Sequence, residues 1–309
     1  MNRFRRLSIA VAVLGCGLGA LGADAADRSQ AVTAVAQGDP DCRKLGDFYW
    51  EIGDAKGVLA SGAVGTEYSA SSEMKIASAS KFVWGAYFLE KIGRNNKPTA
   101  DQLSYLEMRS GYTKLNPFKC LFSKTGDECL SKGENGERVS ADVGRFSYSG
   151  GHDQKLLQVL GLGRLNAAEL TSEVMGYIGR DINLSYAQAQ PAGGMKGTPA
   201  AYGQFLRKIL SGQLRMHDFL GYAPVATQGG NAAFSPAPWP WHYSINHWIE
   251  DDPQGDGAFS SPGLMGFYPW ISADKTTYGI VARQKLSKTA YVESAVCGRK
   301  LRQAWMRGQ

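Results

Sequence analysis

The sequence predicts an α+β fold, in which an antiparallel five-stranded sheet is flanked by helices and interrupted by an inserted helical lobe. Strand-like segments lie near both ends of the chain, two within residues 47–64 and three after residue 241. The stretch between them, from about residue 99 to 236, is rich in helix-like and loop-like pieces. We therefore expect one domain over residues 26–309, with a sheet lobe at about 40–92 and 237–309 and a helical lobe at about 93–236.

The N-terminal segment has the pattern of a secretory signal peptide. Three arginines precede a short apolar run, and residues 23–25 form a small-x-small cleavage site that ends at Ala25. Lipidation of Cys16, which follows a Val-Leu-Gly run, is the alternative to cleavage after Ala25. Because the apolar run is too short and too rich in glycine for a membrane span, we expect a periplasmic or secreted protein without a transmembrane segment after cleavage.

The net charge of the mature chain is small. Cleavage removes three arginines and one aspartate, which lowers the net charge from +6 to +4. No Lys/Arg run is interleaved with aromatic residues, so the sequence does not indicate a nucleic-acid partner. We expect a monomer with either one large core or two lobes that share one site.

Each element follows from its residue pattern. Residues 47–64 are typical of two strands joined by a turn at residues 54–57, and residues 74–93 form an apolar helix. Apolar residues recur at helical spacing within residues 200–214. Residues 242–250, 266–272 and 276–284 are aromatic or β-branched strands, and residues 293–305 form a last helix.

Four cysteines remain after cleavage, which suggests two disulfides in an oxidising compartment. Cys120 and Cys129 bracket one short polar loop, and their pairing leaves Cys42 to meet Cys297 near the opposite end of the chain. A zinc site is the weaker alternative, because the four histidines show no ligand spacing with these cysteines.

The apolar helix begins with Ser78-Ala79-Ser80-Lys81. Residues three apart lie on the same helix face, so the Lys81 amine can reach the Ser78 hydroxyl. Apolar neighbours should partly desolvate the amine, which favours the neutral form that accepts a proton. The alternative is a helix cap beside a solvent-exposed lysine.

This motif and two later segments resemble the serine β-lactamase and penicillin-binding protein superfamily, especially its class C β-lactamase-like and esterase branch. The second family element, Tyr-Ser-Asn, corresponds to Tyr148-Ser149-Gly150, in which Gly150 replaces the asparagine that usually contacts the substrate or the lysine. The resemblance implies a β-lactamase/transpeptidase-like fold and an acyl-enzyme mechanism without a metal or organic cofactor.

The third family element is Lys-Thr-Gly or His-x-Gly on a sheet strand. A literal Lys124-Thr125-Gly126 precedes Tyr148 and lies inside the cysteine-bracketed loop, so we interpret it as a surface turn. Ser261-Pro262-Gly263, followed by Gly266-Phe267, is the better match, although Ser261 replaces the basic residue. Ser261, Gly263 and Gly150 are thus the expected substrate-binding positions.

The resemblance implies a role for each matched residue. Ser78 would attack an acyl carbon, Lys81 would activate it, and Tyr148 would relay a proton to the leaving group. The backbone N–H groups of Ser78 and Leu264 would form the oxyanion hole.

The expected substrate is a small ester or amide, or a cell-wall peptide. A true β-lactamase or D-Ala-D-Ala carboxypeptidase is an alternative, in which Arg283 would have to bind the substrate carboxylate. A catalytically silent cell-wall peptide-binding protein is a second alternative, suggested by the losses at Gly150 and Ser261. Four tryptophans could line an apolar acyl pocket, although we expect at least half of them to be core residues: Trp239, Trp241, Trp248 and Trp270.

Overall fold

The computed structural model describes residues 20–307, so Cys16 and most of the predicted signal peptide lie outside the described residues. Its centre is an antiparallel sheet of eight strands in the order β2-β1-β13-β12-β11-β10-β9-β7. The predicted α+β class is confirmed, but the sheet has three strands more than the five expected. The strands are β1 (Phe48–Asp54), β2 (Val58–Val64), β7 (Val225–Ala226), β9 (His242–Tyr243), β10 (Trp248–Glu250), β11 (Ala258–Ser260), β12 (Tyr268–Ile271) and β13 (Thr277–Ala282).

The two ends of the chain meet in the middle of this sheet, where β1 pairs with β13. The predicted turn between β1 and β2 is present, and the Asp54 carboxylate accepts hydrogen bonds from the N–H groups of Lys56 and Gly57. The predicted strand at residues 242–250 is instead a tight hairpin of β9 and β10. Asn246 lies in its turn with φ of 53°, a left-handed conformation that ends the extended backbone.

Alternate residues of the central strands face opposite sides of the sheet. Phe48, Trp50 and Ile52 of β1 pack in a core with the C-terminal helix. Tyr49 of the same strand and Ile280 of β13 pack in the second core, on the opposite face. The sheet is therefore covered on both sides, which explains its predominantly apolar strands.

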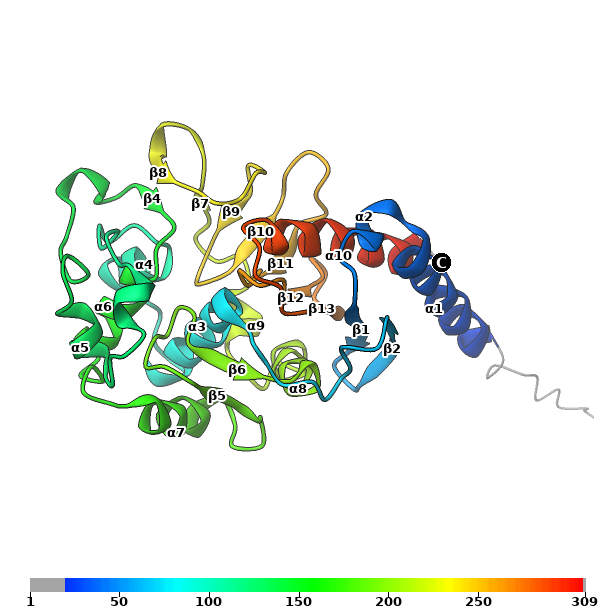
Figure 1. Ribbon diagram of the computed structural model, residues 1–309, viewed down its shortest axis with the longest axis horizontal. Coiled ribbons are helices and arrows are strands. Elements are labelled where there is room, and N and C mark those ends of the chain that lie inside the picture. The colour runs from blue at the N-terminus through cyan, green and yellow to red at the C-terminus, as the bar shows by residue number, and fades with distance from the viewer. Residues whose placement is uncertain (1–19, 308–309) are drawn as a thin grey trace, which may run out of the picture.

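Helices cover both faces of the sheet (Figure 1). Helix α10 (Ala290–Arg307) packs on β12 and β13 and also contacts α1 (Ala20–Gly38) and α2 (Pro40–Arg43), whereas α8 (Pro199–Leu210) packs on β1 and β13. The chain between the two halves of the sheet holds the other helices: α3 (Ser80–Lys91), α4 (Ala100–Leu106), α5 (Gly126–Leu130), α6 (Gly151–Val159), α7 (Ala167–Ile178) and α9 (Met216–Phe219).

Helix α1 crosses the predicted cleavage position at Ala25. Both predicted cysteine pairs are present as disulfides: Cys42–Cys297 ties α2 to α10, and Cys120–Cys129 closes a short loop around α5. Within the described part of the chain, no helix is both long and apolar enough to cross a membrane.

Two small sheets lie outside the main one and position the site described below. One has the order β3-β6-β5, formed by β3 (Met74–Lys75), β6 (Met195–Gly197) and β5 (Leu184–Tyr186). The other pairs β4 (Phe146–Ser147) in parallel with β8 (Ala232–Phe234). Strand β3 leads directly into the Ser78 segment, and β4 leads into Tyr148.

Candidate active site

Ser78 lies in a short 3₁₀ turn, Ala77–Ala79, immediately before α3. Ala77 has φ of 45°, in the left-handed region that residues with a side chain rarely adopt. The turn is held by neighbouring groups: the Ser80 hydroxyl donates to the Ala77 carbonyl (2.6 Å), and the Tyr202 hydroxyl donates to the Ala79 carbonyl (2.8 Å). Such local strain, held by its surroundings, is common at functional sites.

Lys81 lies one turn after Ser78 and is only 3% exposed. Its Nζ is 3.3 Å from Ser78 Oγ and donates a hydrogen bond to the Ala192 carbonyl at 2.9 Å. The predicted contact between the lysine and the serine is therefore present, in a largely desolvated setting. Ser80, the other serine of the motif, instead accepts a hydrogen bond from the Met195 N–H.

Tyr148 lies beside this pair because β4 pairs with β8, and its N–H donates to the Phe234 carbonyl. Lys81 Nζ lies over the face of the Tyr148 ring, 4.7 Å from its centroid. Within residues 20–307, no hydrogen bond joins Lys81 to the Tyr148 hydroxyl. The structure thus brings the three predicted residues together, with the Lys81 nitrogen over the face of the Tyr148 ring.

Gly150 occupies the position at which the resembled family has asparagine, and there is little room for a side chain at this position. A Cβ atom at Gly150 would lie 3.1 Å from the Cβ of Ala192. Ala192 is the residue whose carbonyl holds Lys81. A side chain at position 150 would therefore press on the residue whose carbonyl accepts the Lys81 hydrogen bond.

The third predicted segment lies between β11 and β12, next to the serine. The Ser261 hydroxyl donates to the Ser78 carbonyl at 3.0 Å. Gly263 packs against the Ile76 carbonyl, which a Cβ atom would approach to 2.2 Å. Leu264 is exposed, and in the part of the chain that the structure describes neither its N–H nor that of Ser78 has a protein acceptor. Both N–H groups are available to a ligand.

These segments surround a cavity of about 920 Å³, whose lining includes Ser78, Lys81, Tyr148, Gly150 and Leu264. Ser261 and Gly263 lie behind its wall, where they support the Ser78 backbone. The charged residues in the lining of the described chain are Lys75, Lys81 and Asp142; other lining residues include Leu115, Phe118, Leu121, Phe234, Trp239, Trp241, Trp248, Met265 and Tyr291.

A buried carboxyl group that the sequence did not reveal, Asp153, lies close to Lys81. Asp153 of α6 is fully buried, and one carboxylate oxygen accepts a hydrogen bond from the Asn246 amide at 2.9 Å. Within the described residues, the other oxygen and the Asn246 amide oxygen have no partner. Desolvation raises the pKa of Asp153 to about 7, against the opposing charge of Lys81. In the sequence Asp153 is one of several polar residues of this helix, so nothing marks it as buried.

His152, the neighbour of Asp153, is held neutral. Its ring nitrogens contact the Ser110 hydroxyl (2.6 Å) and the Ser147 carbonyl (2.9 Å), and burial lowers its pKa to about 4. Among residues 20–307, no group of three or more His, Cys, Asp or Glu side chains is arranged to hold a metal ion.

Three residues considered in the sequence analysis lie away from the cavity. Arg283 is buried, and its guanidinium bonds to the Leu45 carbonyl, to Ser294 and to Glu293, so the suggestion that it binds a substrate carboxylate is wrong. Lys124 is exposed, and Thr125 caps α5, so Lys-Thr-Gly begins a helix instead of forming the predicted turn. Trp270 is a core residue.

Comparison with known proteins gives a likeness in structure but not in sequence. No family model matches the chain, and no curated protein is similar to it in sequence. The D-amino acid amidase from Ochrobactrum anthropi SV3 is 12% identical, with 91% of this chain and 99% of that chain covered and a TM-score of 0.65. EstCE1, a hydrolase with promiscuous acyltransferase activity, is 14% identical. The comparison covers 92% of this chain and 99% of that chain, with a TM-score of 0.65.

A β-lactamase from Mycobacterium bovis is 13% identical, with 89% of this chain and 99% of that chain covered and a TM-score of 0.56. At these identities the likeness concerns the fold. The chain therefore has the β-lactamase/transpeptidase-like fold that its motifs predict.

Proposed function

We propose that this protein is a serine hydrolase that cleaves a small ester or amide through an acyl-enzyme formed on Ser78. The contact between Lys81 Nζ and Ser78 Oγ, at 3.3 Å in a cavity of about 920 Å³, is the observation that carries the proposal. A cavity of this size suits a small-molecule substrate. Serine needs an adjacent base to become nucleophilic at neutral pH, and the Lys81 amine is the basic group within reach of Ser78 Oγ.

In the first half-reaction, Ser78 Oγ bonds to the acyl carbon while its proton passes to Lys81 Nζ. The oxygen of the tetrahedral intermediate accepts hydrogen bonds from the free N–H groups of Ser78 and Leu264. Collapse of the intermediate breaks the bond to the leaving group, which takes the proton held by Lys81; Tyr148, whose ring lies beside the amine, is the predicted relay.

In the second half-reaction, a water molecule loses a proton to the Lys81 amine and attacks the acyl carbon. The Ser78–acyl bond then breaks, and the serine oxygen takes back a proton from Lys81. Lys81 thus ends each cycle as it began. Its hydrogen bond to the Ala192 carbonyl keeps the amine within reach of Ser78 throughout.

The surroundings of the proposed nucleophile favour a simple ester or amide over a β-lactam or a D-Ala-D-Ala peptide. Those substrates carry a carboxylate, and in this chain Ser261 replaces the basic residue of the third element. Arg283 points into the core instead of the cavity. Lys75, the lining cation that is not in contact with Ser78, is exposed.

We further propose export of the protein, with the signal peptide over residues 1–25. Two disulfides are compatible with an oxidising compartment. The mature part would form one domain with the cavity between its lobes, because the lining draws on the sheet side (Ser78, Leu264) and on the helical side (Tyr148). Strand β7 belongs to the main sheet although it falls within the range expected for the helical lobe.

Labelling with a fluorophosphonate, read by intact mass and peptide mapping, tests the proposal. We expect one adduct, on Ser78, in the wild-type protein and none in Ser78→Ala. Ser149→Ala is the matched control, because Ser149 lines the same cavity without a lysine contact. An adduct that survives in Ser78→Ala, or is lost in Ser149→Ala alone, would contradict the assignment. A wild-type protein that binds cell-wall peptides but takes no label would instead be the silent binder.

A further inference from the structure

One wall of the cavity is a continuous row of aromatic rings that starts at Tyr148. Tyr148 stacks on Trp248, with ring centroids 5.2 Å apart and planes inclined by 29°. Trp248 meets Trp241 at 6.0 Å, and Trp241 stacks on Trp239 at 4.5 Å. All four residues line the cavity. This aromatic row, Tyr148-Trp248-Trp241-Trp239, leads away from the Lys81 amine, which lies over the Tyr148 ring.

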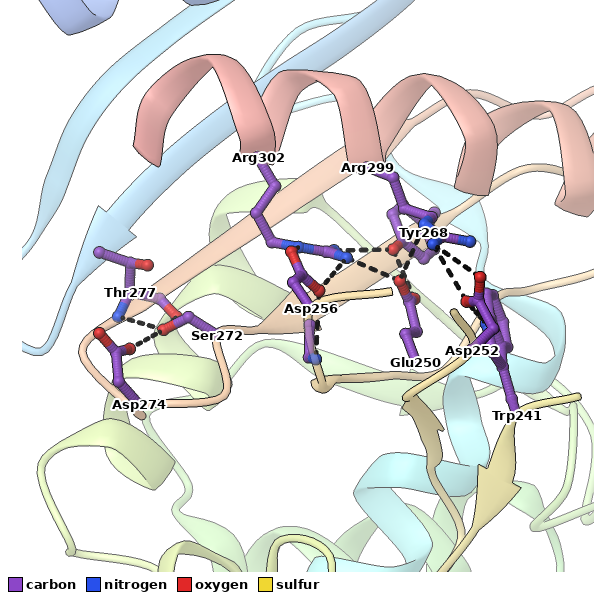
Figure 2. Close-up of polar contacts among 11 residues, drawn as sticks. Trp241, Glu250, Asp252, Asp256, Tyr268, Ser272, Asp274, Thr277, Arg299 and Arg302 are labelled. Carbon is purple, nitrogen blue, oxygen red and sulfur yellow. Dashed lines mark hydrogen bonds and ion pairs between the residues drawn. The ribbon is translucent and has the colours of Figure 1, made fainter. Parts of the chain in front are cut away.

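The far end of the row is fixed by an ion pair from α10. The Trp241 indole N–H donates to Asp252 at 2.6 Å, and Asp252 pairs with Arg299 at 3.0 Å (Figure 2). The Arg299 guanidinium also lies over the Trp239 ring, 5.4 Å from its centroid. Trp241 is buried and Trp239 half-buried, so this end of the row is held in place before any ligand binds. A preorganised surface of this kind loses little entropy on binding.

The row carries no charge that would suit an ionised ligand. Arg299 is already paired with Asp252, and the charged lining residues of the described chain are Lys75, Lys81 and Asp142. Lys75 is exposed, and Asp142 accepts a hydrogen bond from Thr113. A carboxylate placed against the indoles would be desolvated without a partner, which is unfavourable. An uncharged ring would find offset or edge-on partners along the row.

We propose that the aromatic row binds the acyl group of the substrate and that this group is an uncharged aromatic. The inference rests on the proposed acyl transfer to Ser78, because the row begins at Tyr148, beside the serine and lysine. The scissile carbonyl lies at Ser78, and the ring of the acyl group lies against the half-buried Trp239, which the buried Trp241 and Trp248 support from the core. Specificity then comes from the tryptophans, and the leaving group is free to vary.

Hydrolysis of methyl esters, followed by pH-stat so that the leaving group stays constant, tests this directly. We expect kcat/KM for methyl phenylacetate to exceed that for methyl acetate by about tenfold or more, a usual range for discrimination by an apolar pocket. Monomethyl succinate, which carries a carboxylate, should be the poorest substrate. A preference for monomethyl succinate that disappears in Lys75→Ala would overturn the inference.

Two variants compare the aromatic row with an aromatic residue that lies outside the cavity. Trp239→Ala should lower the ratio of the phenylacetate to the acetate rate constants by about tenfold. Phe122→Ala is the control: Phe122 is 94% exposed on the Cys120–Cys129 loop, lies outside the cavity lining, and should leave the ratio unchanged. Equal ratios in wild type and Trp239→Ala, with both proteins folded by circular dichroism, would refute the role of the row.

Binding to the inactive Ser78→Ala protein separates this inference from the proposed function. Titration with methyl phenylacetate, read by tryptophan fluorescence, should show saturable binding that weakens about tenfold in Ser78→Ala/Trp239→Ala. Such binding without fluorophosphonate labelling of the wild type would leave the row as a ligand site and refute the hydrolase. Labelling at Ser78 without any phenyl preference would refute the row and leave the hydrolase standing.

Discussion

Gly263→Ala is the substitution for which the structure gives the sharpest expectation. A Cβ atom at this position would lie 2.2 Å from the Ile76 carbonyl oxygen and 3.3 Å from that of Phe267. Neither oxygen can move freely: Phe267 accepts the Gly263 N–H at 2.7 Å, and Ile76 is tied through its own N–H to Met195. The added methyl group must therefore separate the segment before β12 from the segment that carries Ser78.

The size of the shift follows from the contact. Ordinary Cβ contacts lie at 3.4 Å or more, so a contact of 2.2 Å requires a displacement of about 1 Å. Overpacking of this kind typically costs about 1–3 kcal/mol, which a domain of this size can tolerate. The displacement would move the Leu264 N–H away from the proposed oxyanion, and a misplacement of about 1 Å can cost about 100-fold in rate.

Steady-state hydrolysis of an aryl acetate measures the effect. We expect Gly263→Ala to lower kcat by about 100-fold with an unchanged circular dichroism spectrum. Gly176→Ala is the matched control, because a Cβ atom at that exposed helix position meets nothing within 4 Å. Lys124→Ala, in the literal Lys-Thr-Gly, should change kcat by less than about threefold, a typical surface effect. A large loss of kcat in Lys124→Ala together with an unchanged kcat in Gly263→Ala would refute our interpretation of the third element.

Three further predictions concern the lysine, the buried carboxyl and the disulfides. Lys81→Arg should lose as much kcat/KM as Lys81→Ala, because guanidinium stays protonated and cannot act as the base; near wild-type activity would place the base elsewhere. The raised pKa of Asp153, about 7, means that the fold prefers the neutral carboxyl, so the free energy of unfolding should fall by up to about 4 kcal/mol as the pH rises from 4 to 8. Asp153→Asn should therefore be more stabilising in urea titrations at pH 8 than at pH 5, and an equal effect at both would contradict this. Loss of the Cys42–Cys297 bond should cost about 2–4 kcal/mol, and non-reducing peptide mapping that finds another pairing would contradict the structure.

Long elements with a strong residue pattern could be predicted from the sequence. The β1–β2 hairpin, the Ser78 helix and the C-terminal helix all have clear periodicity or turn residues. The extra sheet strands β7, β9 and β11 are two or three residues long, too short for alternation to be visible. The turn at Asn246 could have been anticipated, because asparagine tolerates the left-handed conformation better than most residues.

The sequence predicts those contacts of the site that join residues close together in the chain. It does not reveal the contacts that join residues far apart in the chain. Ser78 and Lys81 meet because they are one helical turn apart. The Ala192 carbonyl that holds Lys81 is 111 residues away, and nothing in a backbone carbonyl marks it in a sequence. The structural role of Arg283 is hidden in the sequence for the same reason, since its partners come from the first and last parts of the chain.

The Cys42–Cys297 bond also constrains the order in which the protein can mature. Cys42 precedes the first strand of the main sheet and Cys297 follows the last one, 255 residues later. The ribosome therefore finishes every strand of that sheet before the second sulfur exists, and the β1–β13 pairing must wait equally long. Contacts so distant in sequence form slowly. The oxidant that closes this bond can act only after every strand of the main sheet has been synthesised, and premature pairing of Cys42 with another cysteine is the error that a disulfide isomerase would have to correct.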